Sequence, residues 1–95
     1  MREEEIIEKI TAYAVAGKLN GMAIDVPFGN VFLRMENINV VDGTLYFDQY
    51  RSSDNEEWSR TGRGFRLNEH VKSYLQSVLD KIQELVQVDK NLFQP

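Results

Sequence analysis

The sequence predicts a single α+β domain over residues 1–95. In chain order it has a helix, a curved four-stranded antiparallel sheet and a long C-terminal helix, with the helices covering one face of the sheet. Apolar residues recur at helical spacing near both ends of the chain, whereas the middle is rich in β-branched and aromatic residues. The Asp42–Gly43 pair lies between two of these β-prone runs and favours a type I′ hairpin turn. A chain of 95 residues suits one core, because domains of this size rarely divide.

The first predicted helix covers residues 3–19. Ile6 and Ile10 fall at helical spacing, and the Asn20–Gly21 pair is expected to end the helix. This helix is additional to the sheet-and-helix unit that follows it.

The second predicted helix covers residues 68–88, with Asn68 as its N-cap. Its apolar residues form one stripe of about five turns, which is wide enough to cover a sheet. The stripe contains Val71, Leu75, Val78, Leu79, Ile82, Leu85 and Val86.

The sheet is predicted over residues 22–67. Its expected strands cover 22–28, 30–41, 44–51 and 60–67. Side chains alternate between the two faces of a strand, so Leu45, Phe47, Phe65 and Leu67 should face the helices. The same alternation turns Arg66 to the opposite face, which no helix is expected to cover.

Composition narrows the class of protein. The net charge of −4 argues against strong non-specific affinity for nucleic acid, although three arginines gather within residues 60–66. Cysteine is absent, no secretory signal pattern is recognisable and no stretch is long and apolar enough to span a membrane. We therefore expect a soluble cytoplasmic protein.

The sequence predicts no enzyme, no metal site and no cofactor. His70 is the single histidine and is expected on the surface, so no nucleophile–base set can be assembled. Gly62 and Gly64 match neither a phosphate loop nor a dinucleotide fingerprint. The acidic residues of 54–57 lack the spacing of a calcium loop, and a solvated loop is the simpler interpretation.

A binding function has more support, because aromatic residues and arginines are interleaved over the second to fourth strands. Aromatic rings stack on unpaired bases while arginines neutralise phosphates. Gly64 would leave room for a close approach beside the outward-facing arginine. The candidate nucleic-acid-binding residues are Arg34, Tyr50, Arg51, Trp58, Arg60, Arg63 and Arg66.

Two of these assignments have structural alternatives. Trp58 either packs on the hairpin or stacks on a base, and Arg60 and Arg63 either bind phosphate or pair with the nearby Glu56 and Glu57. Nucleic-acid binding predicts a contiguous positive strip on the uncovered face, which would run through Arg34, Arg51 and Arg66, whereas a neutral or acidic face argues against it.

The stretch "TLYFDQYRSSDNEEWSRTGRGFRL" (44–67), with the helix "NEHVKSYLQSVLDKIQEL" after it, resembles the single-stranded DNA-binding domain of the transcriptional positive cofactor four family. Arg63 to Leu67 match its basic–Gly–apolar–polar–Leu signature without a gap. The resemblance implies a ββββα fold and a homodimer formed through the C-terminal helix. It also implies sequence-tolerant binding of single-stranded DNA, or of RNA, with Arg63 as the strongest inherited candidate.

The chain departs from that family in charge. Asp48 stands where the family usually places an arginine, and the loop of residues 54–57 is acidic. These departures support an alternative hypothesis, in which the same scaffold is an acidic protein-interaction module with a protein partner and no nucleic acid.

Overall fold

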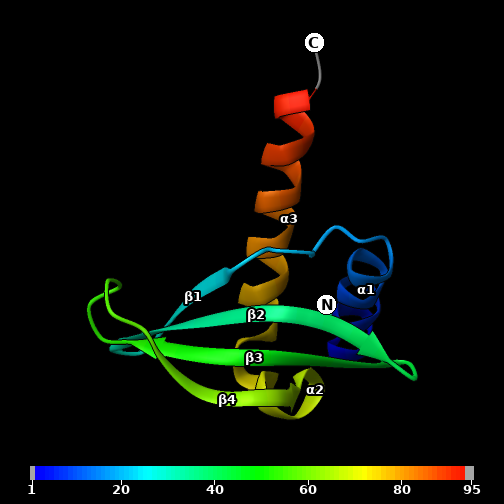
Figure 1. Cartoon of the computed structure of the whole chain (residues 1–95). Coiled ribbons are helices and arrows are strands. Elements are labelled where there is room, and N and C mark those ends of the chain that lie inside the picture. Colours follow the sequence, from blue (N-terminus) through cyan, green and yellow to red (C-terminus); the bar gives the residue numbers. More distant parts are fainter. Residues whose placement is uncertain (1, 94–95) are drawn as a thin grey trace.

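The computed structural model describes residues 2–93, and the side chains of residues 2–87. It confirms an α+β fold with an N-terminal helix, four antiparallel strands and a C-terminal helical segment (Figure 1). In chain order the elements are α1 (Glu3–Val15), β1 (Ile24–Phe28), β2 (Val31–Val41), β3 (Thr44–Ser52), β4 (Ser59–Arg66), α2 (Leu67–His70), the 3-10 turn η1 (Lys72–Tyr74) and α3 (Leu75–Phe93).

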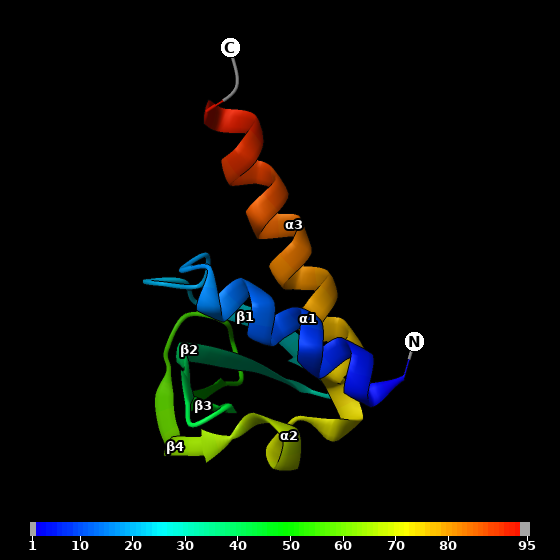
Figure 2. The same ribbon diagram turned by 90° about the vertical axis from the view of Figure 1, so that its right-hand side faces the viewer.

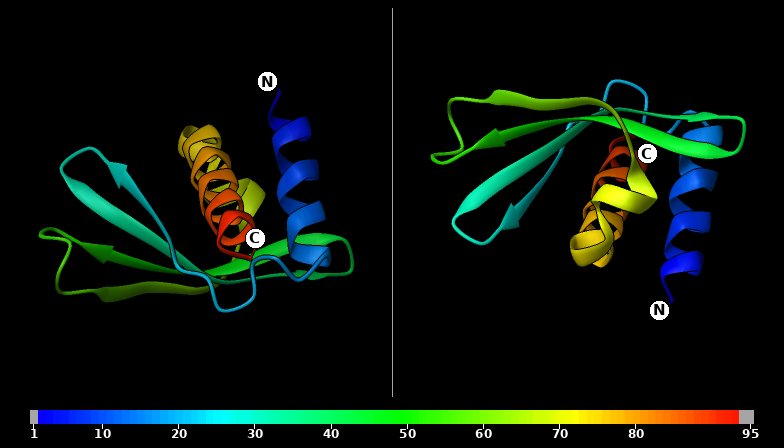
Figure 3. Two further views of the ribbon diagram at one scale, coloured as in Figure 1. Left: turned by 90° about the horizontal axis from the view of Figure 1, so that it is seen from above. Right: turned by 90° about the horizontal axis from the view of Figure 1, so that it is seen from below.

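The strands form one curved sheet in the order β1-β2-β3-β4, so each strand pairs with its neighbour in the sequence. Both long helices lie on the same side of the sheet, and the opposite face is uncovered (Figure 3). The buried core lies between the sheet and the helices, and its side chains come from both helical regions and from strands β1 to β3. It contains Ile6, Ile10, Leu19, Ile24, Val26, Leu33, Met35, Ile38, Leu45, Phe47, Leu67, Val71, Tyr74, Leu75, Val78, Leu79 and Ile82.

The first helix ends at Val15, earlier than predicted, and Gly17 terminates it in place of the Asn20–Gly21 pair. Gly17 has a positive φ of 75°, and its N–H donates to Ala14 O at 3.1 Å. The N–H of Lys18 donates to Tyr13 O at 3.0 Å, which completes a Schellman motif. The chain can therefore leave the helix at Gly17 and bury Leu19 before β1 begins.

The prediction of one continuous helix over 68–88, capped by Asn68, is wrong. Helical structure begins at Leu67 without a side-chain cap, breaks at Val71 and resumes in α3, which continues to Phe93. The break turns the chain, because α2 lies beside β3 and β4 whereas α3 rises from the sheet (Figure 2). The predicted apolar stripe is nevertheless correct up to Ile82, and Leu85 and Val86 are partly buried against the core.

The hairpin between β2 and β3 has the predicted turn. Asp42 and Gly43 both have positive φ values, 51° and 77°, as a type I′ turn requires. Farther along the same strands the pairing register shifts between Glu36 and Asn39, and the β3–β4 register shifts after Phe47. Irregularities of this kind increase the local bend of a sheet.

The predicted inward residues of the last strand are confirmed in part. Leu67 is fully buried, whereas Phe65 is half-buried at the sheet edge. The Phe65 ring packs edge-on against Phe47 at 6.0 Å and stacks on His70 at 4.1 Å, between ring centroids. Among the described residues, no helix has the length and apolarity needed to cross a membrane.

Candidate nucleic-acid interface

The uncovered face of the sheet carries polar and aromatic side chains in cross-strand rows. In one row, Asp25 of β1 pairs with Arg34 of β2, Arg34 pairs with Tyr50 of β3, and Tyr50 pairs with Arg60 of β4. Because side chains alternate along a strand, this row lies on the face opposite to the buried Leu33 and Leu45. This row therefore brings three of the predicted residues, Arg34, Tyr50 and Arg60, onto one surface.

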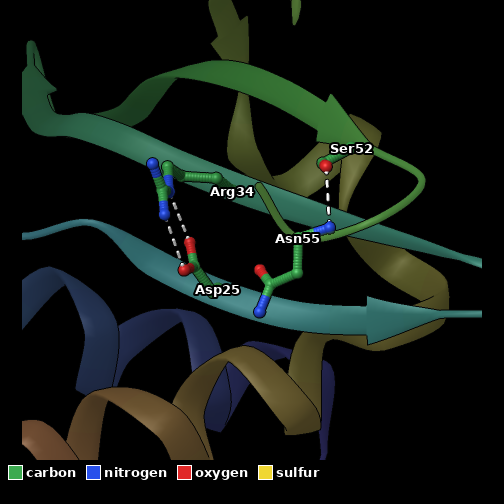
Figure 4. A network of polar contacts seen from close by, with 4 residues as sticks. All are labelled: Asp25, Arg34, Ser52 and Asn55. Carbon is green, nitrogen blue, oxygen red and sulfur yellow. Dashed lines mark hydrogen bonds and ion pairs between the residues drawn. The ribbon is translucent and has the colours of Figure 1, made fainter. Parts of the chain in front are cut away.

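Arg34 is engaged by neighbouring side chains. Its guanidinium donates to both carboxylate oxygens of Asp25, at 2.7 and 3.0 Å (Figure 4). It also lies over the ring of Trp58, 4.1 Å from the ring centroid. The hydrogen bond to Asp25 raises the pKa of Arg34. One face of the half-buried indole is thereby covered, as the hairpin-packing interpretation of Trp58 predicts.

The loop between β3 and β4 is ordered by its own side chains. The buried Ser52 Oγ accepts a hydrogen bond from the backbone N–H of Asn55 (Figure 4) and another from that of Asp54. Asp54 Oδ1 in turn accepts from the N–H groups of Glu56 and Glu57, at 2.9 and 3.0 Å, and these bonds lower the pKa of Asp54. This acidic residue thus shapes the loop.

Arg51 lies on the opposite face from Arg34 and Tyr50. Its cross-strand partner is Leu33, which is buried on the helix side, and Arg51 lines a hollow of about 460 Å³ beside Tyr74. Alternation along a strand separates Arg51 from Tyr50, so the sequence already contained this signal.

The expected positive strip through Arg34, Arg51 and Arg66 is therefore not formed. Arg51 is on the other face, and Arg34 is paired with Asp25. Arg66 is exposed and forms an ion pair with Glu69 at 3.3 Å, and that carboxylate raises the pKa of Arg66.

The edge strand β4 carries three exposed arginines, which are Arg60, Arg63 and Arg66. Within the described part of the chain, no ion pair joins Arg60 or Arg63 to the loop glutamates. Arg63 instead lines an open depression of about 400 Å³ together with Tyr46 and Asp48.

The Asp48 carboxylate beside these arginines is already hydrogen-bonded within the sheet. Asn37 Nδ2 donates to Oδ2 and the Gly64 N–H donates to Oδ1, both at 2.9 Å. These two bonds, and then the nearby Arg63 and Arg60 charges, lower the pKa of Asp48. Asp48 is therefore ionised at neutral pH, and its carboxylate is fixed in the sheet by Asn37 and Gly64.

Two residues of this surface were absent from the list of candidate binding residues. Asn39 and Tyr46 are cross-strand partners on the uncovered face, and both line the depression. Strand alternation correctly places Tyr46 on the same face as Tyr50. Gly64 has a positive φ of 66° and donates its N–H to Asp48, so the backbone conformation at the β4 irregularity also requires glycine here.

Fold and site together describe a small α+β domain with one uncovered, arginine- and tyrosine-bearing sheet face. Comparisons with protein-family models, with curated proteins and with solved structures found no match for this chain.

Proposed function

We propose that this protein binds single-stranded nucleic acid along the β3–β4 side of its uncovered sheet face. The observation that carries the proposal is the line of three exposed arginines on β4, with Tyr46 paired to Arg66 and Tyr50 paired to Arg60. Tyrosine rings provide stacking surfaces for bases, and the arginines neutralise the backbone between them. Such a surface recognises a strand with little dependence on sequence.

The charges indicate modest, salt-sensitive affinity. The whole chain carries −4, so attraction must come from the local arginines. If the three β4 arginines each neutralise one phosphate of a single strand, the logarithm of affinity should fall against the logarithm of salt concentration with a slope of about −2. Arg34 is not counted among these contacts, because its guanidinium is paired with Asp25 and lies over Trp58.

Fluorescence anisotropy with a labelled single-stranded oligonucleotide at 20 mM and 200 mM salt tests the proposal. The triple variant Arg60→Ala, Arg63→Ala, Arg66→Ala is expected to abolish binding. A matched triple variant, Lys9→Ala, Lys18→Ala, Lys72→Ala, removes the same charge from exposed positions off this face and should retain it. No binding by the wild type at 20 mM salt, or equal losses in both variants, contradicts the proposal.

We also propose that the binding form is a homodimer joined through α3. This helix extends beyond the rest of the molecule (Figures 1 and 2), and Leu85 and Val86 are only partly buried there. Light scattering is expected to give a molar mass of two chains for the wild type. Val86→Glu should lower this mass towards that of one chain. A wild-type monomer at about 100 µM, where a dimer with a Kd of about 1 µM would be almost completely formed, contradicts the dimer.

A second candidate function is a protein-interaction module. The specific observation in its favour is that Arg34 and Arg66 are already paired with the chain's own Asp25 and Glu69. These pairs reduce the net positive charge of the uncovered face. Pull-down from cell extract with and without nuclease separates the two candidates. A partner that is retained after nuclease supports the interaction module, and one that is lost supports nucleic acid.

A further inference from the structure

Beside the β4 arginines, the uncovered face carries a second cross-strand row with a different chemistry. Asn39 of β2 pairs with Tyr46 of β3, and Tyr46 pairs with Arg66 of β4. An amide, an aromatic ring and a guanidinium therefore stand side by side across three strands. Asn39 and Arg66 are exposed, and Tyr46 is half-buried.

Asn39 and Tyr46 of this row line the depression of about 400 Å³, which Asp48, Arg63 and Gly64 also line. The two register shifts make room for it, because the sheet is irregular at Asn37 in β2 and at Gly64 in β4. Asp48 fixes both irregularities through its bonds to Asn37 and Gly64, so the depression has a defined edge. Its lining combines polar side chains with apolar surface from Val41 and Phe47, whereas the row at Arg34 is covered by Trp58 and Asp25.

We infer that this depression holds a single unpaired base of the bound strand and reads its edge through Asn39. The inference rests on the proposed function and deepens it, since it adds base selection to a surface that is otherwise tolerant. The Tyr46 ring stacks on the base, and Arg63 contacts the adjoining phosphate. The Asn39 amide offers one donor and one acceptor to the exposed edge of the base.

Tyr46, Arg63 and Asn39 contribute differently to the affinity for a strand and to the choice of base. Stacking on Tyr46 is available to every base, and the charge of Arg63 meets every phosphate, so neither selects a sequence. The amide alone depends on which donors and acceptors the base presents. Asn39 is therefore the specificity-determining residue of this subsite, and Tyr46 and Arg63 supply affinity.

The test compares labelled 12-mers of dA, dC and dT, measured by anisotropy at low salt with the full chain. The wild type is expected to discriminate between the best and the worst of them by about fivefold or more, the effect of one amide–base contact. Asn39→Ala should bring the ratio close to one. Arg63→Ala should weaken all three equally and reduce the salt slope, while leaving the ratio unchanged.

Variants at Tyr46 complete the design. Tyr46→Phe keeps the ring and should bind like the wild type, whereas Tyr46→Thr keeps a strand-forming residue and should lose about 5- to 100-fold for all three oligonucleotides. Circular dichroism checks that each variant is folded. Equal wild-type affinity for the three 12-mers, or discrimination that survives Asn39→Ala, overturns the inference and leaves the proposed function standing. A wild type that binds none of them overturns both.

Discussion

The side chain of Asp48 on β3 accepts a hydrogen bond from the backbone N–H of Gly64 on β4, at 2.9 Å between N and Oδ1. The other carboxylate oxygen accepts from Asn37 of β2 at 2.9 Å. One side chain therefore joins three strands at the places where their pairing is irregular. The residue that argued most strongly against nucleic-acid binding in the sequence is a structural element of the sheet.

Removing this carboxylate should destabilise the sheet. Asp48→Ala is expected to lower the free energy of unfolding by about 1 kcal/mol at pH 7, a small value because both bonds are solvent-exposed. The folded-state pKa of Asp48 is lowered, so its contribution is present above the unfolded value near 3.8 and is lost as the pH falls through the folded pKa. Urea unfolding of both proteins at pH 7, 4 and 2.5 should therefore show that the difference between their unfolding free energies becomes smaller as the pH falls. A difference independent of pH would contradict this role of the carboxylate.

Gly62 should be intolerant of a side chain. A Cβ at this position would lie 1.8 Å from the nearest atom of the Phe65 ring, so the ring must move. Gly62→Ala is expected to cost about 1–3 kcal/mol of unfolding free energy. In a Phe65→Ala background the same substitution should cost much less, because the obstructing ring is gone. Equal costs in both backgrounds, measured by urea unfolding, would show that the ring is not the cause.

Arg51 and Arg60 offer a charge-matched comparison of the two faces. Each substitution to alanine removes one positive charge, but Arg60 pairs with Tyr50 on the uncovered face and Arg51 pairs with Leu33 on the other. Arg60→Ala is expected to reduce oligonucleotide affinity several-fold and Arg51→Ala to change it by less than about twofold. Similar losses in the two variants would indicate a non-specific charge effect.

Trp58 is the single tryptophan, so its fluorescence reports on Arg34 directly. Arg34→Ala should expose the indole face that the guanidinium covers, which increases acrylamide quenching and shifts the emission to longer wavelength. Arg66→Ala, at the far end of the same face, is the control and should leave the emission unchanged. Unaltered quenching in Arg34→Ala would mean that the stacked pair does not persist in solution.

Much of the fold was predictable from local chemistry. Alternation of apolar residues identified the strands and the inward places of Leu45 and Phe47. The Asp42–Gly43 pair identified the turn, because only a few residues adopt positive φ readily. The apolar stripe of the last helix likewise marked the residues that became buried. These features depend on the chain's own periodicity, so neighbours in the sequence are enough to reveal them.

The tertiary structure decided what each charge does. Arg34 is engaged because the β1–β2 register sets it opposite Asp25, and Asp48 is satisfied because two irregular strands bring Asn37 and Gly64 to it. The break at Val71 likewise follows from packing the last helical segment in two directions against the sheet. Pairing of residues far apart in the chain depends on register and packing, which local pattern does not contain. The sequence by itself determined which side chains are buried, and the three-dimensional arrangement determined which arginines remain open to a ligand.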